Sequence, residues 1–557
     1  MPQDEARVPL SREIIATPPS WLRDTETSAS DRLQSRDHAQ RCPMFRTMSS
    51  FSFSRPRSFA NGRRPALRQS IRNLIVRRSH GESTLANAAF HAAALLLCFI
   101  TLLPTQPARA DSSPPDLLFI AVDDLNDWIS LLDPASPIRT PNLERLASRG
   151  MLFTRAYCVS PACNPSRAAT LVGQRPSTTG VYGNKSDWRR AVGNRPTILK
   201  RLRDAGYQVH GAGKIFHHHL NNAFHDEQSF ESFVPMRPQL YPPQKLNEAP
   251  EYGSRNTDWG IWPESEADSI DARTVDHCIE QLERTDLPAP RAIACGIFKP
   301  HSPFFAPEQY HQPFVNLQPP ERSNTDWNDL PSGAHQLLDK KKWFWNGMMK
   351  LEDRREGALT EFVRSYAACV RFADAQIGRL IDALDKSPRK DQTIVILWSD
   401  HGFHLGEKNH LEKFALWEKT NHIPLIIVAP GVTQPGTVCE QPVDLTLLYP
   451  TLLELFHLPP DPLCDGRSVV PLLRNPMSKW DQPAVMTYGR GNHAVRTRRW
   501  RYIRYADGSQ ELYDHESDPN EWNNLAGLST SAETMTRLQE WMPTAEAMPV
   551  RDLRRAQ

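Results

Sequence analysis

The sequence has no hydrophobic run long enough to span a membrane and no C-x-x-C pair, and it contains only 26 glycines against 48 prolines. A membrane-spanning helix needs about 20 apolar residues, and structural zinc sites favour closely spaced Cys and His ligands. A membrane-spanning protein and a structural zinc site are therefore both disfavoured. The 39% apolar and 23% charged residues are typical of a globular protein, which excludes a wholly disordered chain.

Lysine is absent from residues 1–110, where 16 Arg stand against 8 acidic residues. That segment carries a net charge of +8. Because the whole chain carries +2, residues 111–557 carry a net charge of −6. Because nucleic-acid binding depends on a basic surface, the mildly acidic remainder argues against a nucleic-acid partner.

The N-terminal segment is predicted to be a targeting region behind an extension. Residues 1–84 are rich in Arg, Ser and Pro without an apolar period, which indicates disorder or a start codon placed too far upstream. Residues 85–110 have the features of a signal peptide: a basic flank, an apolar run over Ala92–Leu103, and an A-x-A sequence ending at Ala110. A buried hydrophobic helix is the alternative. We expect cleavage near Ala110, export to the periplasm or beyond, and no stable membrane span.

An exported protein meets an oxidising compartment, where cysteines can pair. Residues 111–557 hold seven Cys, an odd number that leaves one for another task. If Cys163 has that task, the remaining six can pair in several ways, among which the sequence does not choose.

Strand-like and helical segments alternate over residues 111–474. This alternation predicts an α/β catalytic domain with a large, mostly parallel sheet between layers of helices. From about residue 475, short segments rich in Tyr, Arg and Trp predict a small antiparallel subdomain over 475–557 that ends in a helix near Ala532–Met542. Residues 235–268 and 302–345 are expected to be long insertions at one end of the sheet. The predicted strands are 117–122, 207–212, 291–297, 393–398 and 425–428, and the main predicted helices are 141–149, 168–172, 196–204, 270–284, 359–384 and 444–456.

Charged residues directly follow four of the predicted strands. The carboxyl ends of parallel strands meet at one edge of a sheet, where α/β proteins bind ligands, so we expect the four sets to converge. Neighbouring carboxylates repel unless a cation neutralises them, and oxygen-rich sites favour Ca²⁺ or Mg²⁺. An ordinary turn or helix cap is the alternative for any one set alone. The sets are Asp123-Asp124, Lys214 with His217, Lys299 with His301, and Asp400-His401.

The segment Cys163-Asn164-Pro165-Ser166-Arg167, continued to Gly173, resembles the C-x-P-S-R-x-x-x-L-x-G signature of type I sulfatases. Val172 stands where many relatives have Thr, a departure of little expected consequence. Similar blocks follow over most of residues 111–525. Within the family the chain is most similar to iduronate 2-sulfatase-like members. This closer likeness rests on Lys299-Pro300-His301, on Val181-Tyr182 with Trp188-Arg189, and on His401, where many other sulfatases carry Asn. The blocks that resemble the wider family are Pro141–Ala147, Gly213–His217, Lys299–Phe304, Ser399–Gly402, Leu405–Glu407, and Glu511–Asp514 with Asp518-Pro519 and Glu521.

The resemblance implies an alkaline-phosphatase-like sulfatase fold and hydrolysis of a sulfate ester on a carbohydrate, with a 2-O-sulfated uronate as the expected substrate. It also implies that a maturation enzyme oxidises Cys163 to formylglycine. One hydroxyl of the hydrated aldehyde attacks sulfur and displaces the alcohol, and the other expels sulfate.

By the same resemblance, Ca²⁺, or else Mg²⁺, is bound by Asp123, Asp124, Asp400 and His401 together with residue 163. Among the remaining site residues, Arg167 orients the formylglycine. Lys214 and Lys413 hold sulfate oxygens. His217 acts as a base, and His301 serves as general acid or sulfate contact.

Two other functions are compatible with these residues. A phosphodiesterase or phosphonate monoester hydrolase of the same superfamily shares the signature, because phosphate and sulfate have the same shape. A non-catalytic binder of sulfated glycans would be favoured by loss of Cys163 or an Asp ligand, and none is lost. A uronate carboxylate needs a cationic partner, and the long insertions favour action at a chain end. The candidate cations are Arg189, Arg190, Lys340 to Lys342, Arg490, Arg496 and Arg498.

Overall fold

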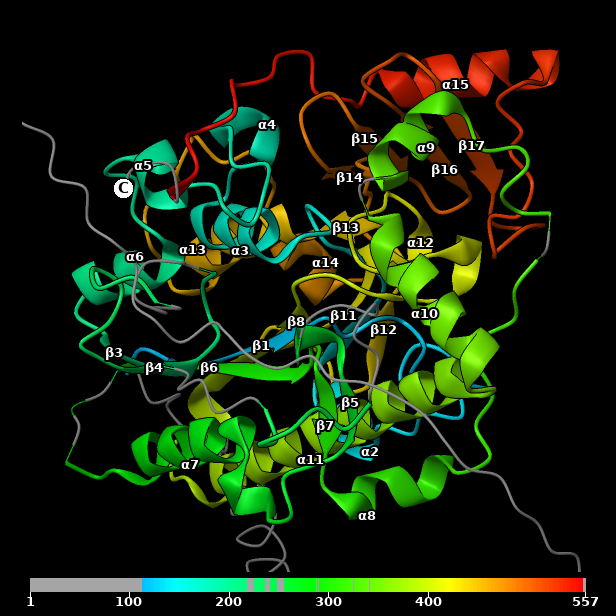
Figure 1. The fold of residues 1–557 in the computed structure, drawn as a ribbon. Coiled ribbons are helices and arrows are strands. Elements are labelled where there is room, and N and C mark those ends of the chain that lie inside the picture. Colours follow the sequence, from blue (N-terminus) through cyan, green and yellow to red (C-terminus); the bar gives the residue numbers. More distant parts are fainter. Residues whose placement is uncertain are drawn as a thin grey trace, which may run out of the picture. The chain divides into compact units, whose positions relative to one another are not determined.

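A computed structural model describes residues 113–217, 225–235, 241–247, 255–286, 288, 290–323, 325–339 and 341–553. The predicted extension and signal peptide, residues 1–84 and 85–110, lie outside this part. All described residues belong to one compact unit, 105–557 (Figure 1). Every helix in the described ranges is too short or too polar to cross a membrane. All seven cysteines of the described ranges are free thiols, and six of them are buried.

A nine-stranded mixed sheet forms the centre of this unit, in the order β12-β2-β11-β8-β1-β6-β3-β4, with β13 beside β2 (Figure 1). The neighbours β8, β1, β6, β3 and β4 are parallel, whereas β11 is antiparallel to both β8 and β2. The strands are β1 (Asp116–Asp123), β2 (Met151–Tyr157), β3 (Gln208–Gly213), β4 (Ser232–Pro235), β6 (Arg291–Pro300), β8 (Thr393–Ser399), β11 (His422–Val428), β12 (Thr437–Cys439) and β13 (Val443–Asp444).

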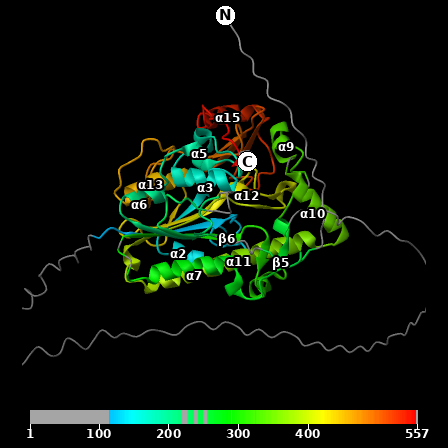
Figure 2. The same ribbon diagram turned by 60° about the vertical axis from the view of Figure 1, so that its left-hand side comes forward.

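Helices cover both faces of the sheet, as predicted (Figure 2). Alternate residues of β1 enter different cores: Leu118 and Ile120 pack towards one helical layer, and Leu117 and Phe119 towards the other. Burial on both faces explains why the strand is apolar throughout. The first layer contains α2 (Pro141–Ala147), α7 (Ile270–Glu283), α10 (Lys342–Arg354) and α11 (Ala358–Lys386); the second contains α3 (Cys163–Val172), α6 (Ile198–Asp204), α13 (Leu448–Leu455) and α14 (Val470–Arg474).

The two predicted insertions hold short elements. A two-stranded parallel sheet joins β5 (Trp259–Ile261) from the first insertion to β7 (Phe304–Ala306) from the second. The second insertion also contains α8 (Glu308–His311) and α9 (Ser332–Asp339), and it reaches the start of α10.

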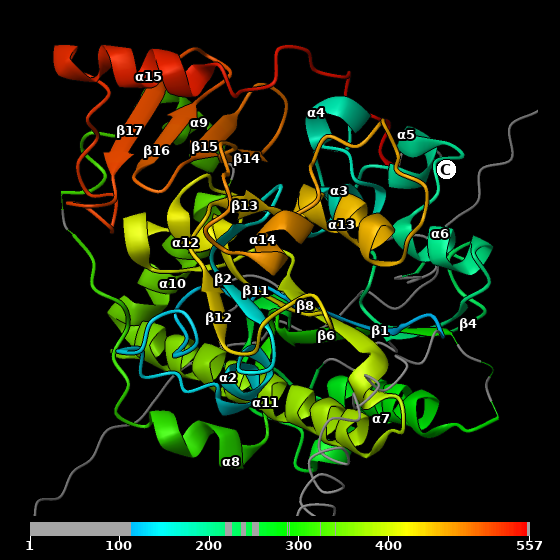
Figure 3. The same ribbon diagram turned by 180° about the vertical axis from the view of Figure 1, so that it is seen from behind.

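The C-terminal region forms a separate four-stranded antiparallel sheet with a final helix, as the residue pattern predicted (Figure 3). One face of this sheet packs against Tyr157 and Trp417 of the larger domain through Ile503 and Tyr513. Its elements are β14 (Ala484–Thr487), β15 (His493–Arg496), β16 (Trp500–Arg504), β17 (Gln510–Asp514) and α15 (Ala532–Gln539).

A buried ionic network also joins the two sheets. Arg501 on β16 is fully buried, and it pairs with Glu418 and, at 2.6 Å, with Glu521. Glu418 begins the short helix α12 (Glu418–Asn421). One residue earlier, Trp417 donates a hydrogen bond of 2.7 Å to Glu511 on β17. The C-terminal sheet thus holds the segment that leads from β10 (Leu411–Glu412) to β11.

We expect Arg501→Met to lower the free energy of unfolding by about 3–5 kcal/mol, because removing one partner of a buried ion pair leaves the other charges unpaired. Urea denaturation monitored by fluorescence measures the change. Arg498→Met is the matched control. Arg498 pairs with Glu440 at 2.6 Å, both side chains are 55% exposed, and loss of such a surface pair costs about 1 kcal/mol or less. Equal effects of the two substitutions would contradict a stabilising role for the buried network.

Candidate active site

Residues from each of the four charged sets predicted from the sequence converge at the carboxyl edge of the sheet, because β8, β1, β6 and β3 are parallel neighbours. Asp123 ends β1, and Asp124 follows it with φ of +62°, a left-handed conformation that non-glycine residues seldom adopt. Asp400 follows β8 directly, and its backbone N–H donates to the carbonyl of Val122 at 3.1 Å. Asp123, Asp124, Asp400 and His401 are fully buried.

Cys163 is the first residue of α3 and lies at the centre of this cluster. Lys413 Nζ donates to its sulfur at 3.0 Å and Lys214 Nζ at 3.6 Å. His401 Nε2 lies 3.3 Å from the same atom, and His217 also forms a hydrogen bond with the thiol. Cations and a helix N-terminus together favour an anionic group at position 163.

The cations around Cys163 favour a negative charge on its sulfur. Burial alone would raise the pKa of the thiol, but Lys214, Lys413 and His401 outweigh it and hold the pKa well below its usual value. Burial would likewise lower the pKa of Lys413, yet Asp124 and the thiolate raise it well above its usual value. The lysine therefore stays charged.

Two carboxylates have oxygens that fit a metal ion. Ligand atoms of Asp123, Asp124, Cys163 and His401 all lie within 4.8 Å of one another. Asp123 Oδ1 and Asp124 Oδ2 are buried and accept no hydrogen bond from the described residues. Unsatisfied buried oxygens are costly, and a divalent cation would satisfy both. The donor set therefore fits the predicted cation.

Asp400 lies beside this group of four and is held mainly by protein donors. Its Oδ2 accepts from Arg167 Nε at 2.7 Å, and its Oδ1 accepts the backbone N–H of Asp124 at 3.2 Å. Burial raises the pKa of Asp400 to about 7, with Arg167 opposing the rise and Asp123 adding to it. Asp400 thus joins the end of β8 to the two carboxylates after β1.

Arg167 connects three of the predicted sets. Its guanidinium is fully buried, and it pairs with Asp400 and with Asp123, whose Oδ1 lies 3.3 Å from Nη2. Nη1 donates to the backbone carbonyls of Lys214 and Ile215. The signature arginine therefore fixes the segment after β3 against the carboxylates. Lys214 in turn pairs with Asp123, and Lys413 with Asp124 at 2.8 Å.

His301 and Lys299 leave the end of β6 in different directions. His301 Nδ1 lies 2.5 Å from the carbonyl of Ser302, so Nδ1 is the donor, while Nε2 lies 3.9 Å from Asp124 Oδ2. Its side chain is 21% exposed, which places it at the entrance of the buried cluster. Lys299, in contrast, donates to the carbonyl of Pro303.

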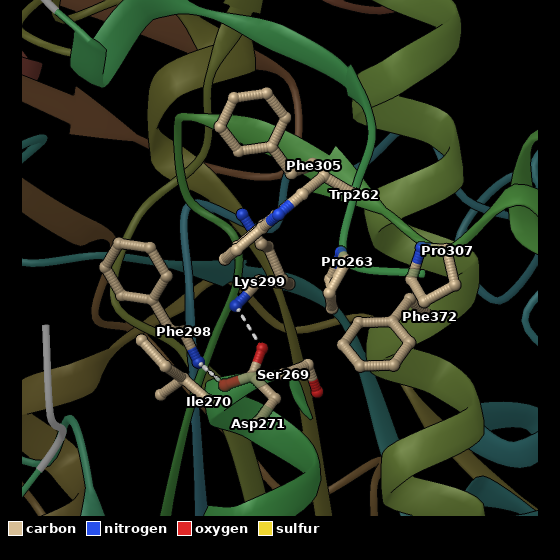
Figure 4. A pocket seen from close by; sticks show the side chains of 10 residues that line it. All are labelled: Trp262, Pro263, Ser269, Ile270, Asp271, Phe298, Lys299, Phe305, Pro307 and Phe372. Carbon is tan, nitrogen blue, oxygen red and sulfur yellow. Dashed lines mark hydrogen bonds between the residues drawn. The ribbon is translucent and has the colours of Figure 1, made fainter. Parts of the chain in front are cut away.

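Figure 4 shows Lys299 beside Asp271 in an aromatic cavity. Asp271 accepts the backbone N–H groups of Phe298 at 2.7 Å and Lys299 at 2.8 Å. The accessible space of about 20 Å³ admits about one water molecule. This cavity is too small for a sugar, so Lys299 stabilises the loop that carries His301.

Four of the eight candidate cations for a substrate carboxylate already have anionic partners. Arg189 pairs with Asp226, Lys342 with Asp339, Arg496 with Glu418, and Arg498 with Glu440. Arg490 lines a cavity beside the C-terminal sheet. Lys340 lies outside the described residues. Lys341 is the candidate whose charge acts near the cluster, where it affects Glu412. The sequence analysis missed Glu412, because a single glutamate beside Lys413 forms no pattern.

Comparisons with known proteins agree with this geometry. The family model described as Sulfatase matches residues 115–458, and one described as N-sulphoglucosamine sulphohydrolase, C-terminal, matches residues 406–547. A Formosa agariphila protein named Sulfatase is 36% identical over 461 residues, which cover 79% of this chain and 89% of that protein. Iduronate 2-sulfatase of Homo sapiens is 29% identical over 401 residues, which cover 64% of this chain and 72% of that protein.

Solved structures show the same fold. A protein solved in complex with its substrate, D-glucosamine-2-N,6-O-disulfate, superposes with a TM-score of 0.62 at 23% identity. The match covers 77% of this chain and 96% of that one.

Proposed function

The chain belongs to the type I sulfatase family and has its alkaline-phosphatase-like fold, and from this premise we propose that it removes sulfate from a sulfated carbohydrate by means of formylglycine at position 163 and a bound divalent cation. The family membership supports hydrolysis of a sulfate ester. The observation that carries the finer proposal is the position of Cys163 at the centre of three cationic side chains.

Asp123, Asp124, Asp400 and His401, with residue 163, would hold Ca²⁺ or Mg²⁺, because their ligand atoms are mainly oxygen. When bound, the cation supplies positive charge beside the reacting sulfate. Formylglycine supplies, as its hydrate, one hydroxyl to attack sulfur and another to release sulfate. Its formation requires a maturation enzyme as a partner.

The remaining residues bind sulfate and move protons. Lys214 and Lys413 lie on either side of residue 163, where they would hold two sulfate oxygens. Arg167 orients residue 163 through its ion pairs with Asp123 and Asp400. His217, within hydrogen-bond reach of residue 163, accepts a proton there. His301 Nε2, at the entrance, donates one to the leaving alcohol or contacts the sulfate.

The proposal extends to location and substrate. We propose export after cleavage near Ala110, which leaves the catalytic domain 111–474 and the C-terminal subdomain 475–557. The similarity to iduronate 2-sulfatase supports a 2-O-sulfated uronate at a chain end.

A substrate panel tests the function. We expect kcat/KM for an aryl sulfate to exceed that for an aryl phosphodiester by at least about 100-fold, equivalent to about 2.7 kcal/mol of transition-state binding. Among natural sulfates, we expect 2-O-sulfated uronates to be preferred over 6-O-sulfated hexosamines, sulfated galactans and choline sulfate. A preference for the phosphodiester would contradict the sulfatase proposal. A preference for a substrate without a carboxylate would overturn only the proposal that the substrate is a uronate.

A further inference from the structure

Glu412 has two features that its place in a short strand does not explain. It is the second residue of β10 and adopts φ of +91°, a left-handed conformation that is strained for a residue with a side chain. Its Oε2 is buried and accepts no hydrogen bond from the described residues. Strained backbone and an unsatisfied buried oxygen are typical of a residue in a ligand-binding or active site.

The surroundings of Glu412 place it at the catalytic cluster. The charged groups that act on its carboxylate are Lys341, Lys413, Asp124 and His301. Lys413 is its chain neighbour and donates to Cys163. The charges that act on the Glu412 carboxylate therefore include both the lysine that contacts Cys163 and the outer residue Lys341.

Lys341 is a cation that has no ion pair among the described residues. It precedes α10, and its side chain is half-buried. Its ammonium lies 3.6 Å from the centre of the Phe414 ring and forms no ion pair with any residue the structure describes. The charged groups around it are Glu412, Lys413 and Lys185. Lys413 is already paired with Asp124 at 2.8 Å, so Glu412 is the carboxylate among these groups that faces Lys341 and Lys185. This local excess of positive charge favours a substrate with an anionic group besides its sulfate.

We propose that Lys341 and Glu412 form a substrate subsite next to the sulfate-binding lysines: Lys341 binds the carboxylate of a sulfated uronic acid, and Glu412 accepts a hydrogen bond from a ring hydroxyl beside the sulfate. The subsite rests on the proposed function, which it makes specific. Tyr488, whose ring centre lies 5.6 Å from that of Phe414, would supply an apolar side for the sugar ring. A quaternary ammonium substrate is disfavoured, because Lys341 already covers the face of Phe414.

Two substitutions that remove a charge, Lys341→Gln and Glu412→Gln, separate the two contacts. The probes are a disaccharide ending in a 2-O-sulfated uronate, the same disaccharide with its carboxylate reduced to an alcohol, and an aryl sulfate. For Lys341→Gln, we expect the ratio of kcat/KM between the uronate and the reduced sugar to fall about 10-fold or more, because the lost contact is a charge-assisted hydrogen bond. For Glu412→Gln, we expect the ratio between either sugar and the aryl sulfate to fall by a similar factor.

The ratios distinguish recognition from mere support of Lys413. A substitution that only displaced Lys413 would lower turnover of all three substrates by one common factor and leave both ratios unchanged, which would overturn the subsite. Lys350→Gln, exposed on the same helix α10, and Glu533→Gln, exposed on α15, are matched controls that should leave both ratios unchanged. If the unaltered protein hydrolyses the aryl sulfate but neither sugar, the subsite is wrong and the sulfatase proposal stands. If it hydrolyses no sulfate ester, both are wrong.

Discussion

Cys163→Ala is expected to lower kcat for sulfate ester hydrolysis by about 10⁴-fold or more, the scale on which removal of a nucleophile acts in other hydrolases. Cys163 is fully buried, and Lys214, Lys413 and His401 all direct their nitrogens at its sulfur. Single-turnover and steady-state assays on an aryl sulfate measure the loss.

Cys163→Ser separates attack from release. A serine hydroxyl can attack sulfur, but it lacks the second hydroxyl on the same carbon that would expel sulfate. We therefore expect at most one turnover and a stable mass gain of one sulfate group on the peptide that contains residue 163. Peptide mass spectrometry of the unaltered, matured protein should show formylglycine at this position. Full activity of protein that retains an intact thiol there would refute the mechanism.

The second large effect is expected from loss of the carboxylates that we propose as ligands of the cation. Asp123→Ala and Asp400→Ala should each lower kcat by about 10³-fold or more, because electrostatic stabilisation of the transition state is usually the largest catalytic contribution. EDTA should abolish turnover of the unaltered protein. Ca²⁺ should restore it better than Zn²⁺, since carboxylate oxygens prefer hard cations.

The fold should survive these two substitutions, and a cooperative thermal transition with an unchanged circular dichroism spectrum would show it. Asp382→Ala is a suitable control. Asp382 pairs with Arg145 at 2.7 Å on the surface, where its side chain is 57% exposed, and its removal should leave activity intact. If either active-site variant kept its activity through prolonged EDTA treatment, the metal site would be assigned to the wrong residues.

The sequence predicted the convergence of the site because position along a strand carries that information. Asp123 and Asp400 each adjoin an apolar run, and parallel neighbours bring such positions to one edge. The direction of a strand could not be predicted from its sequence in the same way. The apolar run in β11 resembles that of β1, yet β11 is antiparallel to both neighbours. Burial on two faces determines which residues a strand contains, whereas the direction of the strand does not change its composition in a recognisable way.

Two other features could not be predicted from residue types. β2 has Thr154 and Arg155 within its apolar pattern, which hides a strand that the tertiary structure stabilises. Lys299 and His301 share a segment, but β6 ends at Pro300, so the alternation of side chains stops between them. Only the folded loop shows that His301 faces the site and Lys299 does not.

The bonds between the C-terminal sheet and the Lys413 segment also bear on how such chains can evolve. Trp417 and Glu418, a few residues after Lys413, are held by Glu511 and Arg501, which lie beyond residue 475. Recombination between two related genes near residue 475 would join Lys413 from one parent to the supporting residues of the other parent. A hybrid would keep a well-placed Lys413 only if both parents had compatible residues on the two sides of the junction. The parts of the chain before and after residue 475 are therefore expected to be inherited together and to change together.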